Sequence, residues 1–238
     1  MHRHFQSERI NELRIVYDSL SSQVEGNTPQ ISKTILYMCS IVWDIIKIPS
    51  NIIYDDSCKD SISKLKASWN GIIISNHTHV FDVPIITSIL LKYIWFDHNI
   101  FCITQKNLIS SFVAEKCWGI SIFQKRDLKT MEKSQVRQAV EENKRIFDEI
   151  IPDILASYWN YLAVFPQGER KEKDDFTIPE RHLRNIYSTD IPFLLVKLLY
   201  SQKTRKLKAD TSVYMDFLDS SEVKSFEDFK KLVDDFYL

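Results

Sequence analysis

The chain has 238 residues, of which 44% are hydrophobic and 26% charged, and its formal net charge is −1 at pH 7. This length indicates one large domain with an attached helical segment, and the composition is globular rather than disordered. A chain so close to neutral lacks the strongly basic surface that is typical of nucleic-acid binding, so no nucleic-acid partner is expected.

Glycine is unusually scarce in this chain. Average usage of about 7% would give roughly 17 glycines at this length, whereas the sequence has 4, at positions 26, 71, 119 and 168. These positions cannot form the patterns G-x-G-x-x-G or G-x-x-x-x-G-K, which excludes the Rossmann and P-loop nucleotide-binding loops.

Cysteine usage and hydropathy indicate the cellular location of the protein. The 4 cysteines form no C-x-x-C pair, which is typical of reduced, cytosolic proteins rather than of zinc ribbons or disulfide frameworks. The polar first residues predict no secretory leader. The longest run without a charged residue, Ile154 to Gly168, is shorter than the about 20 apolar residues that span a bilayer. We therefore expect a cytoplasmic location without a transmembrane helix.

Hydrophobic spacing predicts a pair of N-terminal helices over 4–24 and 31–47, separated by a break at Gly26. The second helix is apolar on most of its sides, so it must be buried in protein or in lipid. A core helix and an interfacial membrane contact both fit this pattern. We divide the chain into an N-terminal helical segment, 1–54, that includes the candidate membrane-contact helix, and an α/β domain, 55–238.

From Trp69 onward, strand-like and helix-like segments alternate, which predicts a mixed, largely parallel sheet flanked by helices. The expected strands are 71–75, 100–104, 121–123, 161–165 and 211–217, the expected helices are 83–95, 107–117, 129–150 and 226–237, and 192–199 fits either class. The helix at 129–150 should end near Pro152 and bury a stripe of Val136, Val140, Phe147 and Ile150. Active residues of such sheets tend to follow the carboxyl ends of strands.

The first polar cluster after a predicted strand contains Asn76, His77 and Asp82. On a regular helix, His77 and Asp82 would point about 140° apart. They can pair if His77 lies in the loop and Asp82 lies in the first turn of the next helix. An imidazole held by a carboxylate is a general base. The alternative is that Asp82 caps the helix and the histidines are loop residues.

A metal site is a further alternative for this segment. His77, His79 and Asp82 partly resemble the H-x-H-x-D-H zinc signature of metallo-β-lactamase-like hydrolases. However, the aspartate comes one place too late, and Val83 stands where another histidine would be expected. The other histidines have no recognisable ligand spacing, so no metal is expected.

Two further clusters also follow predicted strands. One contains Lys125 and Arg126, whose adjacent cations are suited to phosphate. The other contains Gln167, Gly168 and Arg170, a tight turn followed by an arginine. Each of these patterns alone also occurs on ordinary solvated surfaces.

Taken in order, the three clusters resemble the conserved blocks of the glycerolipid acyltransferase superfamily, which includes lysophosphatidic acid and glycerol-3-phosphate acyltransferases. The blocks N-H-x-x-x-x-D, glycine followed by Phe-x-x-Arg, and F-P-E-G-T-R are matched by Asn76, His77 and Asp82, by Gly119, Phe123 and Arg126, and by Phe165, Pro166, Gly168 and Arg170. A weaker fourth block, V-P-x-x-P-V, is similar to 191–196. The resemblance covers about residues 69–217.

The resemblance implies transfer of an acyl group from acyl-CoA or acyl carrier protein to a hydroxyl of a phosphorylated glycerol. The expected acceptor is 1-acylglycerol-3-phosphate, with glycerol-3-phosphate second, and no cofactor is implied besides the acyl donor. His77 would be the base, oriented by Asp82, and no acyl-enzyme would form. The residues expected to bind substrate are Asn76, Lys125, Arg126, Gln167, Gly168 and Arg170.

The family commonly uses N-terminal helices to contact a membrane, so the resemblance also implies peripheral association with a membrane surface. The chain departs from the third block, because Gln167 replaces the glutamate and Glu169 the threonine. These departures bear on the acceptor more than on the reaction type. They also leave open a non-catalytic lipid-binding protein of the same fold.

Overall fold

The computed structural model describes residues 52–53, 55–78, 82, 85–86, 89–90, 99–105, 119–168, 175–201 and 211–237. The helices expected at 4–24, 31–47 and 107–117 lie outside these residues. The boundary between 54 and 55 therefore stays a prediction. Within the described ranges, no helix is both long and apolar enough to cross a membrane.

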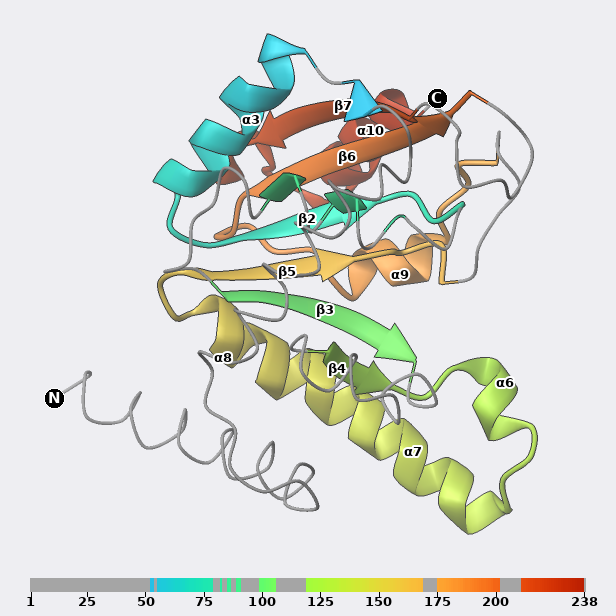
Figure 1. Ribbon diagram of the computed structural model, residues 1–238. Helices are drawn as coiled ribbons and strands as arrows, with labels where there is room; N and C mark the ends of the chain where they lie inside the picture. Colours follow the sequence, from blue (N-terminus) through green and yellow to red (C-terminus); the bar gives the residue numbers. More distant parts are fainter. Residues whose placement is uncertain are drawn as a thin grey trace, which may run out of the picture.

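The centre of the molecule is a 7-stranded sheet with the order β1-β7-β6-β2-β5-β3-β4 (Figure 1). The strands are β1 (Ile52–Ile53), β2 (Gly71–Ser75), β3 (Asn99–Gln105), β4 (Gly119–Ile122), β5 (Asn160–Val164), β6 (Phe193–Tyr200) and β7 (Thr211–Leu218). Neighbouring strands are parallel except for β6 and β7, which are antiparallel. The predicted mixed, largely parallel sheet is therefore confirmed.

Helices cover both faces of the sheet, which explains why β2 and β5 are buried along their whole length. On one face, Ile73 packs with α3 (Asp56–Ala67) and with the buried helical residues Ile85, Ile86, Ile89 and Leu90. On the other face, Ile72 and Ile74 share a core with α8 (Ile151–Leu155), α9 (Glu180–Arg184) and α10 (Phe226–Tyr237). The β-branched run of β2 thus supplies both halves of the core.

Most expected elements are confirmed, with small shifts at their ends. The segment left open at 192–199 is the strand β6, and α10 occupies the range expected for the last helix. The strand expected at 121–123 begins earlier, at Gly119. β1, α3 and α9 (Glu180–Arg184) were not predicted from the sequence.

The helix expected at 129–150 differs from the structure at both ends. The short α6 (Lys125–Leu128) precedes α7 (Lys133–Arg145), which continues through a π-helical turn, Ile146–Ile150, into α8. The chain therefore stays helical past Pro152. The π turn widens the helix just before the proline, which then falls in the first turn of α8, where its missing N–H is tolerated.

The apolar stripe expected on this helix was also wrong at one position. Val140 is 51% exposed, and its neighbour Ala139 is buried instead. The two positions are about 100° apart around the helix axis. The prediction placed Val140 on the buried face of the helix, whereas the smaller side chain of Ala139 faces the core.

Candidate active site

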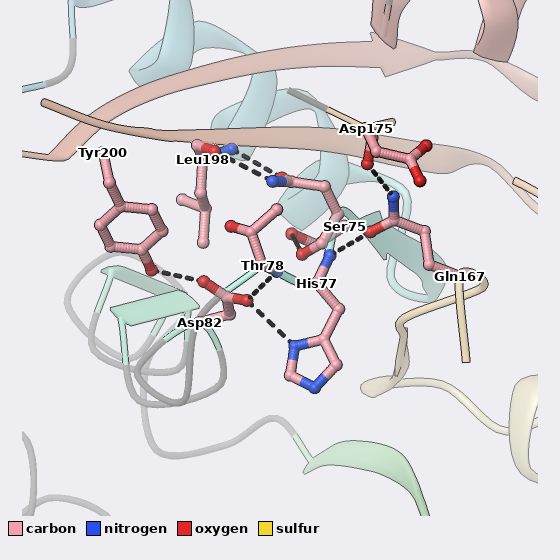
Figure 2. Close-up of polar contacts among 9 residues, drawn as sticks. Ser75, His77, Thr78, Asp82, Gln167, Asp175, Leu198 and Tyr200 are labelled. Atoms are coloured by element: carbon pink, nitrogen blue, oxygen red, sulfur yellow. Dashed lines mark hydrogen bonds and ion pairs between the residues drawn. The ribbon is translucent and has the colours of Figure 1, made fainter. Parts of the chain in front are cut away.

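The loops after β2 and β5 meet at the carboxyl edge of the sheet, because β2 lies between β6 and β5. β2 ends at Ser75 and leads directly to His77, and β5 leads to the turn that contains Gln167 and Gly168. Figure 2 shows that His77, Asp82, Gln167 and Tyr200 converge at this edge although they come from separate segments of the chain.

Asn76 extends the pairing of β2 with β6 by one step through its side chain. Its Oδ1 accepts the Leu198 N–H at 2.7 Å, and its Nδ2 donates to the Leu198 carbonyl at 2.9 Å. The residue has no exposed surface. Its side chain therefore fixes the point at which the His77 loop leaves the sheet, and its expected contact with a substrate stays a prediction.

The contact expected between His77 and Asp82 is present. His77 Nδ1 lies 3.0 Å from Asp82 Oδ2, and the same oxygen accepts the Thr78 N–H at 2.7 Å. His77 is in the loop and Asp82 has helical backbone, so the pair forms across the loop-to-helix junction. The Asp82 side chain is fully buried, whereas that of His77 is 22% exposed.

This geometry sets the protonation pattern of the imidazole. An ionised carboxylate only accepts hydrogen bonds, so the proton between the two groups lies on Nδ1 of His77. The other nitrogen, Nε2, points away from Asp82 and is left as an acceptor (Figure 2). The ring of Phe165, whose centroid lies 4.9 Å from that of His77, packs beside it. The arrangement can remove a proton from a group placed at Nε2.

Tyr200, the last residue of β6, was missed by the sequence analysis. Its hydroxyl donates a hydrogen bond to Asp82 Oδ1, the carboxylate oxygen that does not face His77. Burial, reinforced by the neighbouring charge of Asp82, raises the pKa of Tyr200 far above its ordinary value. The phenol therefore stays protonated and remains a donor. Its place at the end of a strand is the only signal in the sequence that could have identified it.

Gln167 links the loops after β2 and β5. Its Oε1 accepts the backbone N–H of His77 at 2.5 Å, and its Nε2 donates to the carbonyl of Asp175 at 2.7 Å. Gln167 is 4% exposed and holds the two loops together, while its expected contact with a substrate stays a prediction. An ionised glutamate could accept from His77 but could not donate to Asp175. This explains the glutamine at a position where the family pattern has glutamate.

Gly168 makes the turn that follows β5. Its φ of +76° lies in the left-handed region, and its N–H donates to Phe165 O at 2.9 Å. A β-carbon at this position would lie 3.4 Å from Cε1 of His182, whose Nδ1 donates to Pro166 O at 2.5 Å. A larger residue would therefore strain the backbone through its positive φ, while its β-carbon would only make van der Waals contact with His182.

The loop after β4 reaches the same turn. Gln124 Nε2 donates to the Gly168 carbonyl at 3.3 Å, so the second and third sequence clusters are neighbours in space. Lys125 is exposed at the start of α6. The side chain of Arg126 and the whole of Arg170 lie outside the described residues, so their phosphate contacts stay predictions.

These contacts bear on the two alternatives for the His77 segment, in which Asp82 is only a helix cap or the segment holds a metal ion. Asp82 does more than cap a helix, because it pairs with His77 and Tyr200. His79, which would be a ligand in the metal-site hypothesis, lies outside the described residues. Among the described residues, no group of three or more His, Cys, Asp or Glu side chains is arranged to hold a metal ion.

A largely parallel α/β sheet with a histidine–aspartate pair at its carboxyl edge is the architecture expected of a glycerolipid acyltransferase. Comparison with protein families supports this class, because the sequence model described as Acyltransferase matches residues 58–205. The chain belongs to the glycerolipid acyltransferase superfamily, and its activity is of the acyltransferase class. No curated protein gives a significant match.

Proposed function

We propose that the protein transfers a fatty acyl group from acyl-CoA or acyl carrier protein to a hydroxyl of a lysophospholipid, with 1-acylglycerol-3-phosphate as the acceptor. The observation that carries this proposal is the pair formed by His77 and Asp82. Its buried carboxylate holds Nδ1 of a histidine that is partly exposed at the loop edge. The acceptor hydroxyl would lie at Nε2 of His77.

In the proposed reaction, His77 Nε2 takes the proton of the acceptor hydroxyl while the hydroxyl oxygen attacks the thioester carbon. The resulting imidazolium is stabilised by the charge of Asp82. The tetrahedral intermediate then collapses: the carbon–sulfur bond breaks, and the leaving thiolate receives the proton from Nε2. An ester and a free thiol are formed, and His77 returns to its neutral form.

Direct transfer is supported by the two hydroxyl residues beside His77 in the chain. Ser75 is buried and donates its hydroxyl to the carbonyl of Asn76. The hydroxyl oxygen of Thr78 is also buried. Neither is placed to attack a thioester and form an acyl-enzyme, so the substrate hydroxyl is the nucleophile of the proposed reaction.

The acceptor phosphate is assigned to Lys125, Arg126, Gly168 and Arg170. The contact between Gln124 and Gly168 supports this assignment, because it brings the loop with the Lys-Arg pair against the third cluster. We further propose that the protein works at the cytoplasmic side of a membrane, where residues 31–47 contact the lipid surface. A peripheral enzyme of this kind would take its lysophospholipid directly from the bilayer.

The proposal is tested by measuring release of free thiol from labelled acyl-CoA, and in parallel from labelled acyl carrier protein, in the presence of separate acceptors. We expect release with 1-acylglycerol-3-phosphate that exceeds release with glycerol-3-phosphate or with no acceptor. His77→Ala should lower this activity by about 10²- to 10⁴-fold, the usual effect of losing a general base. Turnover close to that of the wild type in a folded His77→Ala variant would refute the mechanism.

A matched control comes from His182, which donates to Pro166 O beside the same loops. His182→Asn keeps a donor at this position and should retain most of the activity. If no acceptor stimulates thiol release by the wild-type protein, the enzyme proposal fails. The alternative, a non-catalytic lipid-binding protein of the same fold, then gains support. Binding of the same lipids to vesicles would then be the measurement to make.

A further inference from the structure

The two oxygens of Asp82 are held from different sides. Oδ2 faces Nδ1 of His77 and the N–H of Thr78, and Oδ1 accepts the hydroxyl of Tyr200. Figure 2 shows the carboxylate lying between the tyrosine ring and the imidazole. Tyr200 itself is buried, so its hydroxyl faces protein rather than solvent. The histidine–aspartate pair is therefore extended by a third side chain.

We infer that Tyr200 is a positioning residue for acyl transfer, which acts through Asp82 on the base His77. This inference rests on the proposed function for its kinetic part. Nothing in the family blocks quoted above includes Tyr200, which follows the fourth block and is the last residue of β6.

Tyr200 fixes the orientation of the Asp82 carboxylate. A carboxylate held at one oxygen alone can turn about its Cβ–Cγ bond and lose its alignment with the imidazole. The hydrogen bond from Tyr200 to Oδ1 holds the second oxygen, so the plane of the Asp82 carboxylate is defined at both ends. Defined geometry of this kind is what a supporting residue must supply for a base to act efficiently.

Tyr200 also lies on a rigid element, the strand β6. Both polar atoms of the Asn76 side chain bond the backbone of Leu198, two residues before Tyr200. Tyr200 itself is paired with Thr211 across the antiparallel strand β7. The tyrosine also belongs to the core cluster that contains Ile85 and other buried residues of the segment after Asp82. The strand, the His77 loop and the Asp82 helix are thereby placed relative to one another.

The Tyr200 hydroxyl also affects the electrostatics of the pair formed by His77 and Asp82. A fully buried carboxylate is costly unless donors satisfy it, and a neutral hydroxyl does so without adding a positive charge. The hydrogen bond from the hydroxyl also stabilises the negative charge of Asp82, which weakens the attraction between Asp82 and the imidazolium of His77. The titratable groups that contact Asp82 include His77 and Tyr200. Because the Thr78 N–H still holds Oδ2 when the Tyr200 hydroxyl is removed, the charge of Asp82 stays beside His77 and should attract a protonated His77 more strongly.

The test compares Tyr200→Phe with Tyr161→Phe in the full-length protein. Tyr200→Phe removes one oxygen and preserves the ring, and we expect kcat to fall about 10-fold with little change in KM, equivalent to about 1.4 kcal/mol. The acidic limb of the pH–rate profile should move to higher pH. Tyr161 is also buried, but its hydroxyl donates to Leu65 O at 3.3 Å, so Tyr161→Phe should leave the profile unchanged.

A double-variant cycle separates positioning from general loss of stability. If Tyr200 acts through Asp82, Tyr200→Phe should have little further effect on kcat in an Asp82→Asn background, because the coupled partner is already changed. Additive effects, or a Tyr200→Phe variant with unaltered kcat and pH profile, would overturn the inference. If Tyr200→Phe fails to fold, 3-fluorotyrosine at position 200 is used, which keeps the hydroxyl but makes it a stronger donor. The acidic limb should then move to lower pH, and an unmoved limb would count against the inference.

The His77 imidazole is also followed by NMR in the absence of substrate. We expect its titration to move to higher pH in Tyr200→Phe and to stay in place in Tyr161→Phe. This readout does not depend on turnover. A wild-type protein without acceptor-dependent thiol release would refute the proposed function, while an unmoved His77 titration would refute the role of Tyr200.

Discussion

The two edges of the sheet hold different polar groups. At the carboxyl edge, side chains that bond the backbone of other segments, as Asn76 does to Leu198 and Gln167 does to His77, lie beside the ionisable pair of His77 and Asp82. At the amino edge, before β2 and β5, the turns are closed by backbone bonds and by neutral side chains such as Asn70, whose Nδ2 donates to Leu155 O at 2.7 Å. There the Trp159 N–H donates to Trp69 O at 2.6 Å, and the two indole rings lie 4.3 Å apart.

This difference separates the groups that support chemistry from those that support the fold. A buried charge such as Asp82 needs several donors in fixed positions, and the Thr78 N–H, the His77 ring and the Tyr200 hydroxyl provide them. The amino edge contributes aromatic packing, with Trp69 and Tyr158 in edge-to-face contact. We therefore expect changes at the carboxyl edge to affect activity and changes at the amino edge to affect stability alone.

The largest expected effect is a loss of stability at alkaline pH, to which tyrosines along the sheet contribute. Burial raises the pKa of Tyr161, near the amino edge, to about 12, and it raises the pKa of Tyr200 and Tyr237 further. Above the ordinary tyrosine pKa of about 10, the unfolded chain loses these protons while the folded chain keeps them. Stability therefore falls with rising pH, by about 1.4 kcal/mol per tyrosine for each pH unit.

Urea unfolding followed between about pH 9 and 12 measures this slope. Three buried tyrosines give a combined loss of about 4 kcal/mol per pH unit above about pH 10. Tyr161→Phe should remove the contribution of one tyrosine from the dependence of the free energy of unfolding on pH. This effect should end near pH 12, where Tyr161 also ionises in the folded state. A wild-type slope that stays flat above pH 10 would show that the tyrosines ionise freely in the folded state.

The next effect is expected for Gln167→Glu at the carboxyl edge. The introduced carboxyl is buried against the Asp175 carbonyl, to which it can donate only when protonated. Burial raises its pKa in the folded state above the unfolded value of about 4.3, so the variant loses stability as pH rises above that value. We expect a loss of about 2 kcal/mol at neutral pH and activity that declines with pH.

Gln167→Met is the matched control, since it has a similar size but no polar atom. It should lose stability and activity by amounts that do not depend on pH, because it leaves His77 N–H and the Asp175 carbonyl unpaired at every pH. Gln167→Glu with full activity up to about pH 8 would contradict the assigned contacts, since a buried glutamate would by then be ionised or relocated.

Much of this architecture could be predicted because local patterns were strong. The β-branched run at β2 and the amphipathic pattern of α10 predicted their elements with the observed bounds. The spacing of His77 and Asp82 allowed their contact if a loop preceded the helix start, and the resemblance to the acyltransferase blocks implied it. By contrast, α3 was missed, because serines and lysines interrupt its apolar positions.

The rest of the site could not be predicted because it depends on pairing between distant strands. Tyr200 and Asp82 are 118 residues apart, and Asn76 and Leu198 are 122 apart. Only the position of β6 beside β2 brings these residues together. Gln167 was recognised as a departure from the family pattern, but its burial and its bond to the Asp175 carbonyl required the structure.

The smallest effect is expected at the amino edge, for Trp69→Gly. Trp69 is 46% exposed and has a φ of +70°, a left-handed backbone that costs a non-glycine residue about 1 kcal/mol or more. Glycine removes this strain, but it also removes the packing against Trp159, worth about 0.5–1.5 kcal/mol. The two terms oppose each other, so the free energy of unfolding should change by about 1 kcal/mol or less, with kcat unaltered. A fall in kcat without a loss of stability would show that the amino edge is coupled to His77, and the separation between the two edges would then fail.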